Sequence, residues 1–405
     1  MLAAAAAVVA LSACWITAVL LRPQRSKRSE QAAAAERWAL QDRAKIKVLA
    51  TSEANERFPA PPTCLVTGGS GMVGRRVIEL LLERGAQRVV CFDLCAPAAQ
   101  RLHHSKVEYV IGDICDKQAL EAACKGIDTV FHIAALVGPF FTHAMYEPVN
   151  YQGTLNVIAA CRACGVKKLV DCSSPSTRFP GGDFGGDITG QGEDELPYPS
   201  RFSHEYARTK ALGERAVLEA AAEPPLLTCA VAPHQVYGPT DQLFVPAMLD
   251  TARSGRLRIF GDGQNWVSFT HMDNIAHGLL CAANALKSAD SPANGKFFVV
   301  TDGSCHNLWA TIDSAVVQCG FTSLAIKWHL PLWLLYPLAY IGTLVTALTG
   351  RFVKLSPFTI RMLVIHRYFD ISRSRDILQY RPIVAFEDGW RETVEAHRKR
   401  RAKTE

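Results

Sequence analysis

Three residues in the middle of the chain have side chains suited to proton transfer at an alcohol. Tyr206 and Lys210 are four positions apart, a spacing that places them on one face of a helix, and Ser174 follows the predicted strand Lys168–Cys172. A free tyrosine, with a pKa of about 10, is a poor base at neutral pH. A neighbouring ammonium stabilises the phenolate, and roughly 4 kcal/mol of such stabilisation lowers the pKa by about three units. We predict that Tyr206 removes a hydroxyl proton while Ser174 donates a hydrogen bond to the substrate oxygen.

An alcohol oxidation of this kind needs a hydride acceptor, and the sequence predicts a dinucleotide site upstream. The apolar run Thr63–Thr67 leads into Gly68, Gly69, Gly71 and Gly74, and a helical pattern follows. The order strand, glycine turn, helix lets a pyrophosphate approach the backbone and the positive end of the helix dipole. A tight turn alone is the competing interpretation. We expect the positive nicotinamide ring to act with Lys210 in stabilising the phenolate.

The next predicted strand selects between the two nicotinamide dinucleotides. Nineteen residues after Gly74, the run Arg88–Phe92 ends in Asp93. A carboxylate at this place binds the adenosine ribose hydroxyls of NAD and repels the additional phosphate of NADP. NAD is therefore predicted, although Arg75 and Arg76 are close enough in sequence to complicate that choice.

Strands and helices continue to alternate after this unit, which predicts an α/β fold with a Rossmann-type, doubly wound parallel sheet. After the strand Val107–Ile111, Asp113 either faces the adenine or caps the next helix. We interpret His132, in the strand Thr129–Ile133, as a packed residue rather than a catalyst. Residues 175–200 are rich in glycine, proline and aspartate and predict a long loop. Beyond Pro239 the alternation weakens, as expected for a smaller C-terminal lobe that binds substrate.

These motifs together resemble those of the extended short-chain dehydrogenases/reductases, and within them the 3β-hydroxysteroid dehydrogenase/isomerase family. The resemblance covers residues 60–395 and includes the segments 67–76, 92–93, 112–114, 131–135, 150–156, 173–174, 206–210, 236–239, 261–265 and 271–274. Ala232 departs from it, because the family commonly has arginine before Pro233, and this puts an outer contact of the site in doubt.

The resemblance implies a catalytic set of Ser174, Tyr206 and Lys210. The cofactor-binding residues that we predict are Gly68, Gly71, Met72, Val73, Gly74, Asp93, Asp113, Ile114, Ala134, Tyr206, Lys210 and Pro233. No metal site is predicted. The only Cys-x-x-Cys, Cys161 to Cys164, lies in a helical pattern without a second pair at metal spacing, so structural burial is the better interpretation.

Two uncharged segments suggest contact with a membrane. Residues 2–21 at ~1.5 Å each would span a bilayer core of roughly 30 Å, and the basic cluster from Arg22 to Arg28 would stay cytoplasmic. A cleaved signal peptide is the alternative, but it would need a basic start. Residues 330–350 contain Pro331 and Pro337, which favour a helix in the membrane interface or the wall of a lipid pocket over a simple span; a core helix is the remaining alternative.

The predicted organisation of the chain has five parts. They are a transmembrane anchor with its basic flank (1–28), a helical or loose linker (29–60), the NAD-binding domain with the catalytic residues (61–240), a substrate-binding lobe with the apolar segment 330–350 (241–395), and a basic tail (396–405).

The net charge of +6 is concentrated at the ends of the chain, and no aromatic residues are interleaved with the basic ones in a way that would argue for nucleic acid. Thirteen scattered cysteines indicate a reducing, cytosol-facing domain.

The resulting hypothesis is a membrane-bound enzyme, at the endoplasmic reticulum with its catalytic domain facing the cytosol, that oxidises the 3β-hydroxyl of a sterol or steroid with NAD. Decarboxylation of a 4α-carboxysterol and isomerisation of a Δ5-steroid both stay open as the step that follows, and a homodimer is neither required nor excluded. One alternative is an extended reductase or epimerase that acts on a nucleotide sugar or another small alcohol. The other is a non-catalytic NAD-binding scaffold.

Overall fold

The computed structural model describes residues 24–43, 46–95, 102–138, 140–179, 186–202, 204–349, 353 and 355–402. The predicted anchor at residues 2–21 lies outside this part of the chain. Of the helices within the described ranges, none combines the length and the apolar character needed to cross a membrane.

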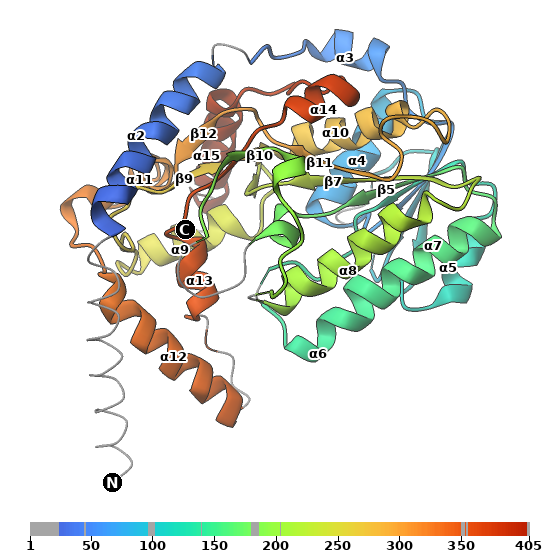
Figure 1. Cartoon of the computed structure of the whole chain (residues 1–405). Coiled ribbons are helices and arrows are strands. Elements are labelled where there is room, and N and C mark those ends of the chain that lie inside the picture. The colour runs from blue at the N-terminus through green and yellow to red at the C-terminus, as the bar shows by residue number, and fades with distance from the viewer. Residues whose placement is uncertain are drawn as a thin grey trace.

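A seven-stranded parallel sheet lies at the centre of the larger part of the molecule (Figure 1). Its strand order is β11 (Lys296–Val300), β7 (Leu227–Pro233), β5 (Lys168–Cys172), β4 (Thr129–His132), β1 (Thr63–Thr67), β2 (Arg88–Asp93) and β3 (Val107–Ile111). The chain builds outward from β1 to β3 and then returns to β4 on the other side of β1. This reversal is the switch point at which doubly wound sheets bind ligands, beyond the carboxyl ends of the strands. The α/β prediction is confirmed.

Helices cover both faces of this sheet, because alternate residues of each strand point to opposite sides. On one face, Cys64 and Val66 of β1 pack with α4 (Met72–Glu83) and α10 (Met272–Ala285). On the other face, Leu65 packs in a core to which three further helices contribute. These are α5 (Lys117–Ala123), α7 (Thr154–Ala163) and α8 (Glu205–Ala220).

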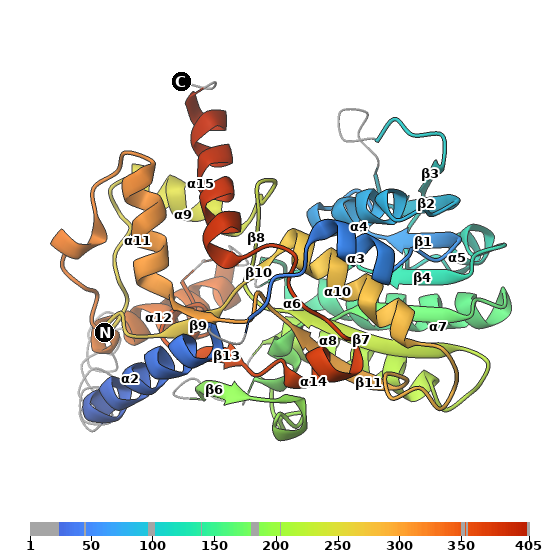
Figure 2. The same ribbon diagram turned by 90° about the horizontal axis from the view of Figure 1, so that it is seen from above.

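The smaller lobe contains a mixed sheet and several helices (Figure 2). The sheet order is β12 (Cys305–Asn307), β9 (Trp266–Ser268), β13 (Arg367–Phe369) and β6 (Ile188–Gln191), and β8 (Val236–Tyr237) pairs with β10 (Thr270–His271). One apolar core joins α9 (Phe244–Arg253), α11 (Leu308–Gln318) and α15 (Phe386–Ala402). A separate cluster joins α12 (Leu332–Thr349) to α13 (Pro357–Met362), and α14 (Ser372–Ile377) packs beside β11.

Segments from each side of residue 240 cross into the other part of the molecule. The strand β11 and the helix α10 follow residue 240 but belong to the large sheet. The strand β6 precedes residue 240 but pairs with β13 in the small sheet, where the Ile188 amide donates to the His366 carbonyl at 2.9 Å. The predicted loop 175–200 thus contains β6 and the short 3₁₀ helices η3 (Pro175–Arg178) and η4 (Glu193–Glu195).

The segment that precedes β1 packs on the body of the protein. Helix α2 (Gln24–Arg43) buries Ala35 and Ala39 against Tyr368 of the small sheet, and after α3 (Thr51–Arg57) Phe58 is buried in the main core. Two helices cover most of residues 29–60, so the helical alternative describes this segment better than a loose linker does. The small alanine side chains on one face of α2 allow the helix to pack closely on the small sheet.

Candidate active site

The glycine turn after β1 has the close approaches that the sequence predicts. Gly68 has φ +67°, a left-handed conformation that favours glycine, and a Cβ there would lie 2.8 Å from the Ala134 amide nitrogen. A Cβ on Gly74 would lie 2.1 Å from the Gly68 carbonyl oxygen. Gly71 is the N-cap of α4 without a side-chain cap, which leaves room at the helix N-terminus for a phosphate. Met72 and Val73 form the first turn of this helix.

Asp93 lies at the tip of β2, beside the glycine turn. Its carboxylate accepts hydrogen bonds from the backbone amides of Ser70 at 3.0 Å and Cys95 at 3.4 Å. These contacts hold the carboxylate at the mouth of the turn, where the ribose of a dinucleotide would lie. Arg75 and Arg76 are engaged elsewhere, in ion pairs with Glu79, Glu83 and Asp273 at 2.7 to 3.4 Å.

The remaining predicted cofactor residues line the same carboxyl-terminal edge of the sheet. Asp113 is exposed and accepts from the Cys115 amide at 2.9 Å, whereas the cap of α5 is Asp116; the capping alternative for Asp113 was therefore wrong. Ile114 is buried next to Gly153. Pro233 ends β7 and is buried.

His132 is a packed strand residue, as predicted. Both ring nitrogens are within hydrogen-bond distance of a hydroxyl, Nδ1 at 2.8 Å from Thr67 Oγ1 and Nε2 at 3.0 Å from Thr154 Oγ1. Burial, with the neighbouring Lys210 charge, lowers the pKa of His132 to about 3. A neutral, fully engaged imidazole supports the helix packing rather than proton transfer.

The three predicted catalytic side chains come together at the ends of β5 and α8. Tyr206 and Lys210 lie in the first two turns of α8, which is capped by His204 through a 3.0 Å hydrogen bond from the Tyr206 amide. Ser174, directly after β5, lies close enough to the Tyr206 side chain to favour its ionised form, and Ser174 Oγ lies 2.9 Å from Ser176 Oγ. Lys210 Nζ donates to the Cys172 carbonyl at 3.0 Å. One strand end and one helix therefore fix all three groups.

The electrostatics of Tyr206 differ from the expectation in one respect. Burial raises the pKa of Tyr206, while Lys210 and Ser174 act in the opposite direction, and the net direction is upward. The ammonium alone therefore does not offset the loss of water around the phenol. In the protein without cofactor Tyr206 is a neutral phenol, and the predicted lowering needs an additional positive charge.

A buried carboxylate next to Lys210 is the first site residue that the sequence analysis missed. Asp171 is 1% exposed, and its Oδ1 lies 3.7 Å from Lys210 Nζ without a hydrogen-bond partner. Burial raises the pKa of Asp171 to about 6, against the effect of Lys210. For Lys210, burial lowers the pKa, but Asp171 and then Tyr206 raise it, and the net direction is upward. Asp171 thus helps to keep the lysine charged.

We expect Asp171→Asn to move the alkaline limb of the pH–kcat/KM profile to lower pH by about one unit. The sign follows from charge: without a carboxylate beside it, the ammonium is less favoured and Lys210 loses its proton earlier. Asp128→Asn is the matched control, because Asp128 pairs at 2.8 Å with Lys167, which is 75% exposed. An unchanged limb in Asp171→Asn, or an equal shift in both variants, would remove Asp171 from this role.

A second missed group lies behind the catalytic residues. Glu214 is 1% exposed; it accepts from Ser173 Oγ at 2.5 Å and Tyr198 Oη at 2.6 Å, and pairs with Arg178 at 2.5 Å. Thr177 Oγ1 also donates to it, at 3.1 Å. The guanidinium in turn lies over the Tyr198 ring, 3.6 Å from its centroid. Glu214 could have been found from its spacing in the sequence. It follows Lys210 by four residues, so it lies one helical turn further along the same face of α8.

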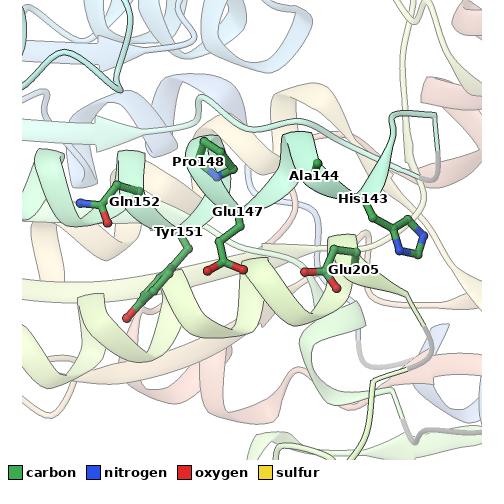
Figure 3. A pocket seen from close by; sticks show the side chains of 7 residues that line it. All are labelled: His143, Ala144, Glu147, Pro148, Tyr151, Gln152 and Glu205. Atoms are coloured by element: carbon green, nitrogen blue, oxygen red, sulfur yellow. The ribbon is translucent and has the colours of Figure 1, made fainter.

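A surface hollow lies beside the start of α8. It has a volume of about 730 Å³ and is lined by His143, Ala144, Glu147, Pro148, Tyr151, Gln152 and Glu205 (Figure 3). These residues come from α6 (His143–Tyr146), the π-helix η2 (Glu147–Gly153) and the start of α8, and none is a predicted catalytic or cofactor residue. Arg208 bridges Glu147 and Glu205 across it.

Comparison with known proteins assigns this geometry to a family. The model of the 3-beta hydroxysteroid dehydrogenase/isomerase family matches residues 65–332. The chain belongs to this family. It is thus an NAD(P)-dependent oxidoreductase of the extended short-chain type, and the predicted resemblance is confirmed.

Several characterised relatives cover most of the chain. Sterol-4-alpha-carboxylate 3-dehydrogenase, decarboxylating, from Mus musculus is 35% identical over 82% of this chain and 90% of its own length. The 3beta-hydroxysteroid-dehydrogenase/decarboxylase isoform 1 of Arabidopsis thaliana is 33% identical over 82% of this chain and 79% of its own length. The solved structure of a dTDP-glucose 4,6-dehydratase from Streptomyces venezuelae, with NAD and TYD bound, aligns with a TM-score of 0.66 and 21% identity over 84% of this chain and 98% of that one, a likeness of fold alone.

Proposed function

We propose that the protein oxidises the 3β-hydroxyl of a sterol with NAD, and that its substrate carries a 4α-carboxylate. The observation that supports the proposal is that Ser174, Tyr206 and Lys210 meet at the carboxyl end of β5, on the same edge of the parallel sheet as the glycine turn that follows β1. The relatives that are sterol-4-alpha-carboxylate dehydrogenases support the choice of substrate. A non-catalytic scaffold has no need for a buried phenol held close to a serine hydroxyl and an ammonium.

NAD, when bound, supplies the hydride acceptor, and the residues of the chain fit it. A side chain at position 68 would collide with the backbone of Ala134, so only glycine allows the tight turn that would bring backbone amides to a pyrophosphate. Asp93 would bind the ribose hydroxyls. Because Arg75 and Arg76 already pair with carboxylates, they offer little to a 2′-phosphate, which supports NAD over NADP.

The protein side of the reaction is a proton transfer between fixed groups. Ser174 donates a hydrogen bond to the sterol oxygen, and the Tyr206 phenolate accepts the hydroxyl proton. Lys210 stabilises the phenolate, and its own charge is supported by Asp171. The 3-keto product of a 4-carboxysterol is a β-keto acid, which loses carbon dioxide readily, so decarboxylation needs no further catalytic group from this chain.

The proposal is tested on the detergent-solubilised full chain with a matched substrate panel. The panel contains a 4α-carboxysterol, the same sterol without the carboxylate, a Δ5-3β-hydroxysteroid and a UDP-sugar, each with NAD and with NADP. We expect the highest kcat/KM with the 4α-carboxysterol and NAD, at least about tenfold above NADP, and one carbon dioxide released per NADH formed. Turnover of the UDP-sugar alone, or oxidation without carbon dioxide release, would contradict the proposal.

A further inference from the structure

A second serine hydroxyl lies beside that of Ser174. Ser176 is 6% exposed, and its Oγ lies 2.9 Å from Ser174 Oγ, a distance typical of a hydrogen bond between two hydroxyl groups. Among the residues that the structure describes, Ser174 is the only hydrogen-bond partner of the Ser176 hydroxyl. The proposed proton transfer involves Ser174 but not Ser176. A buried hydroxyl with this single partner can influence the reaction only through that partner or by touching the substrate itself.

The turn after β5 directs two donors of Ser176 at the oxygen of Ser174. Ser174 is the N-cap of η3, and Pro175 at the next position has no N–H group. The backbone donor that satisfies the cap is therefore the Ser176 amide, which donates to Ser174 Oγ at 3.2 Å. The turn is held further by Thr177, whose Oγ1 donates to the Ser174 carbonyl at 2.8 Å. The amide and the hydroxyl of Ser176 thus both lie within hydrogen-bond distance of one oxygen.

The hydrogen-bonding capacity of a serine hydroxyl limits what Ser174 can do for a substrate. Such a hydroxyl has two acceptor sites and one proton. When Ser176 donates both its N–H and its O–H, both acceptor sites of Ser174 are filled. The proton of Ser174, which is partly exposed, is then all that it offers to the crevice. Without the Ser176 hydroxyl one acceptor site is free, and the substrate hydroxyl or the Tyr206 phenol can donate to it.

The direction of the Ser174 hydrogen bond matters because oxidation requires the substrate proton to go to Tyr206. A substrate hydroxyl that donates to Ser174 instead has to turn before it can react. A Ser174 that can only donate leaves the substrate proton to Tyr206, and its O–H is a stronger donor because neighbouring hydrogen bonds polarise one another. Burial raises the pKa of Tyr206, and Ser174 opposes that rise, which agrees with a Ser174 proton that points towards the phenol oxygen.

We propose that Ser176 is a positioning residue, which donates its hydroxyl proton to Ser174 and thereby keeps Ser174 a hydrogen-bond donor to the substrate oxygen. This role rests on the proposed function, since Ser174 acts as a donor in that reaction. Two other roles are possible for the same hydroxyl: contact with the substrate itself, such as the carboxylate of a 4α-carboxysterol, and stabilisation of the turn alone. The three roles predict different behaviour of the same variants.

A double-mutant cycle in the full chain separates positioning from the other two roles. The variants are Ser176→Ala, Ser174→Ala and the two combined, assayed with the alcohol of the substrate panel that is oxidised fastest. We expect Ser176→Ala to lower kcat about tenfold, as for the loss of one hydrogen bond, with KM changed by less than about twofold. In the Ser174→Ala background it should cost nothing further. Ser176→Thr keeps a hydroxyl and should restore kcat to within about threefold. An equal loss with and without Ser174 would overturn the proposal.

Two comparisons exclude the other roles. The 4α-carboxysterol and the same sterol without the carboxylate should lose kcat by the same factor in Ser176→Ala. A loss confined to the carboxylated sterol, with a raised KM, would make Ser176 a substrate contact and overturn the proposal. Ser304→Ala is the matched structural control, because Ser304 is also buried and its Oγ lies 2.8 Å from a side chain two residues further on, His306 Nε2, in the small lobe. It should leave kcat unchanged.

A measurement without turnover keeps this role distinct from the proposed function. The ionisation of Tyr206 in the NAD complex is followed by ultraviolet difference titration, each variant against the same variant with Tyr206→Phe. Without the Ser176 hydroxyl, Ser174 can accept from the phenol, which favours its neutral form, so Ser176→Ala should raise the pKa of Tyr206 and Ser304→Ala should not. An unchanged pKa in Ser176→Ala would overturn the proposal even if a sterol is oxidised. A raised pKa would support it even if every sterol of the panel fails.

Discussion

Replacing Tyr206 by phenylalanine is expected to lower kcat by about 10³-fold, within the range of a lost general base, while NAD affinity changes by less than about twofold. The variant loses only the phenol oxygen, which lies close to Ser174 and to the Lys210 charge. The apolar ring stays packed, 6.2 Å from that of Tyr146. Single-turnover oxidation of the sterol measures the loss of rate, and a separate NAD titration measures the change in NAD affinity.

The control for this variant is Tyr151→Phe. Tyr151 lines the outer hollow on η2, so its hydroxyl is outside the catalytic crevice, and kcat should stay at the wild-type value. Turnover of Tyr206→Phe within tenfold of wild type would remove Tyr206 from its role as base. Loss of NAD binding together with turnover would instead indicate that the phenol holds the cofactor.

The raised pKa of Tyr206 also gives the expected sign of the pH dependence of oxidation. The base must be deprotonated, and burial favours its neutral form. Activity should therefore rise with pH until the phenol ionises in the ternary complex. Bound NAD would oppose this rise in the pKa of Tyr206, because its nicotinamide ring would carry a positive charge.

The parts of the site that are local in sequence could be predicted, and those that need the assembled sheet could not. The glycine turn and Asp93 come from one βαβ unit, and Tyr206 and Lys210 come from one helix, so spacing alone indicates that each pair lies close together. The approach of Ser174 to Tyr206 joins two elements that are distant in sequence, and it was predicted only through the substrate oxygen that both would contact and through the family resemblance.

Asp171 and Glu214 show why the remainder was missed. The sequence of β5 does not indicate that the Asp171 side chain lies under Lys210, because the answer depends on which face α8 covers. The ion pair between Glu214 and Arg178 likewise joins α8 to a segment that was predicted to be a loop.

The fold shows the same limit. The alternation of strands and helices predicted the large sheet, but not that β6, before residue 240, joins the small sheet and that β11, after residue 240, joins the large one. These pairings depend on tertiary packing.

Glu214→Ala is expected to reduce the free energy of unfolding by roughly 3–5 kcal/mol, the usual cost of removing one partner from a buried ion pair. The change would leave the guanidinium of Arg178, 6% exposed, without its carboxylate, and it would also leave the hydroxyls of Ser173 and Tyr198 without an acceptor. Urea denaturation of the full chain measures the difference. The control is Glu219→Ala on the exposed side of the same helix, which should change stability by less than about 0.5 kcal/mol.

A double variant separates the ion pair from simple packing. Glu214→Leu/Arg178→Met removes both charges, so it should recover a substantial part of the stability lost in Glu214→Ala, because no buried charge is left unpaired. If the double variant is as unstable as the single one, the loss comes from the hydroxyl partners and from volume instead. Because Ser173 precedes Ser174 and donates to Glu214 at 2.5 Å, the single variant should also lower kcat under conditions in which it is fully folded. Unchanged kcat there would mean that the turn after β5 holds Ser174 without help from α8.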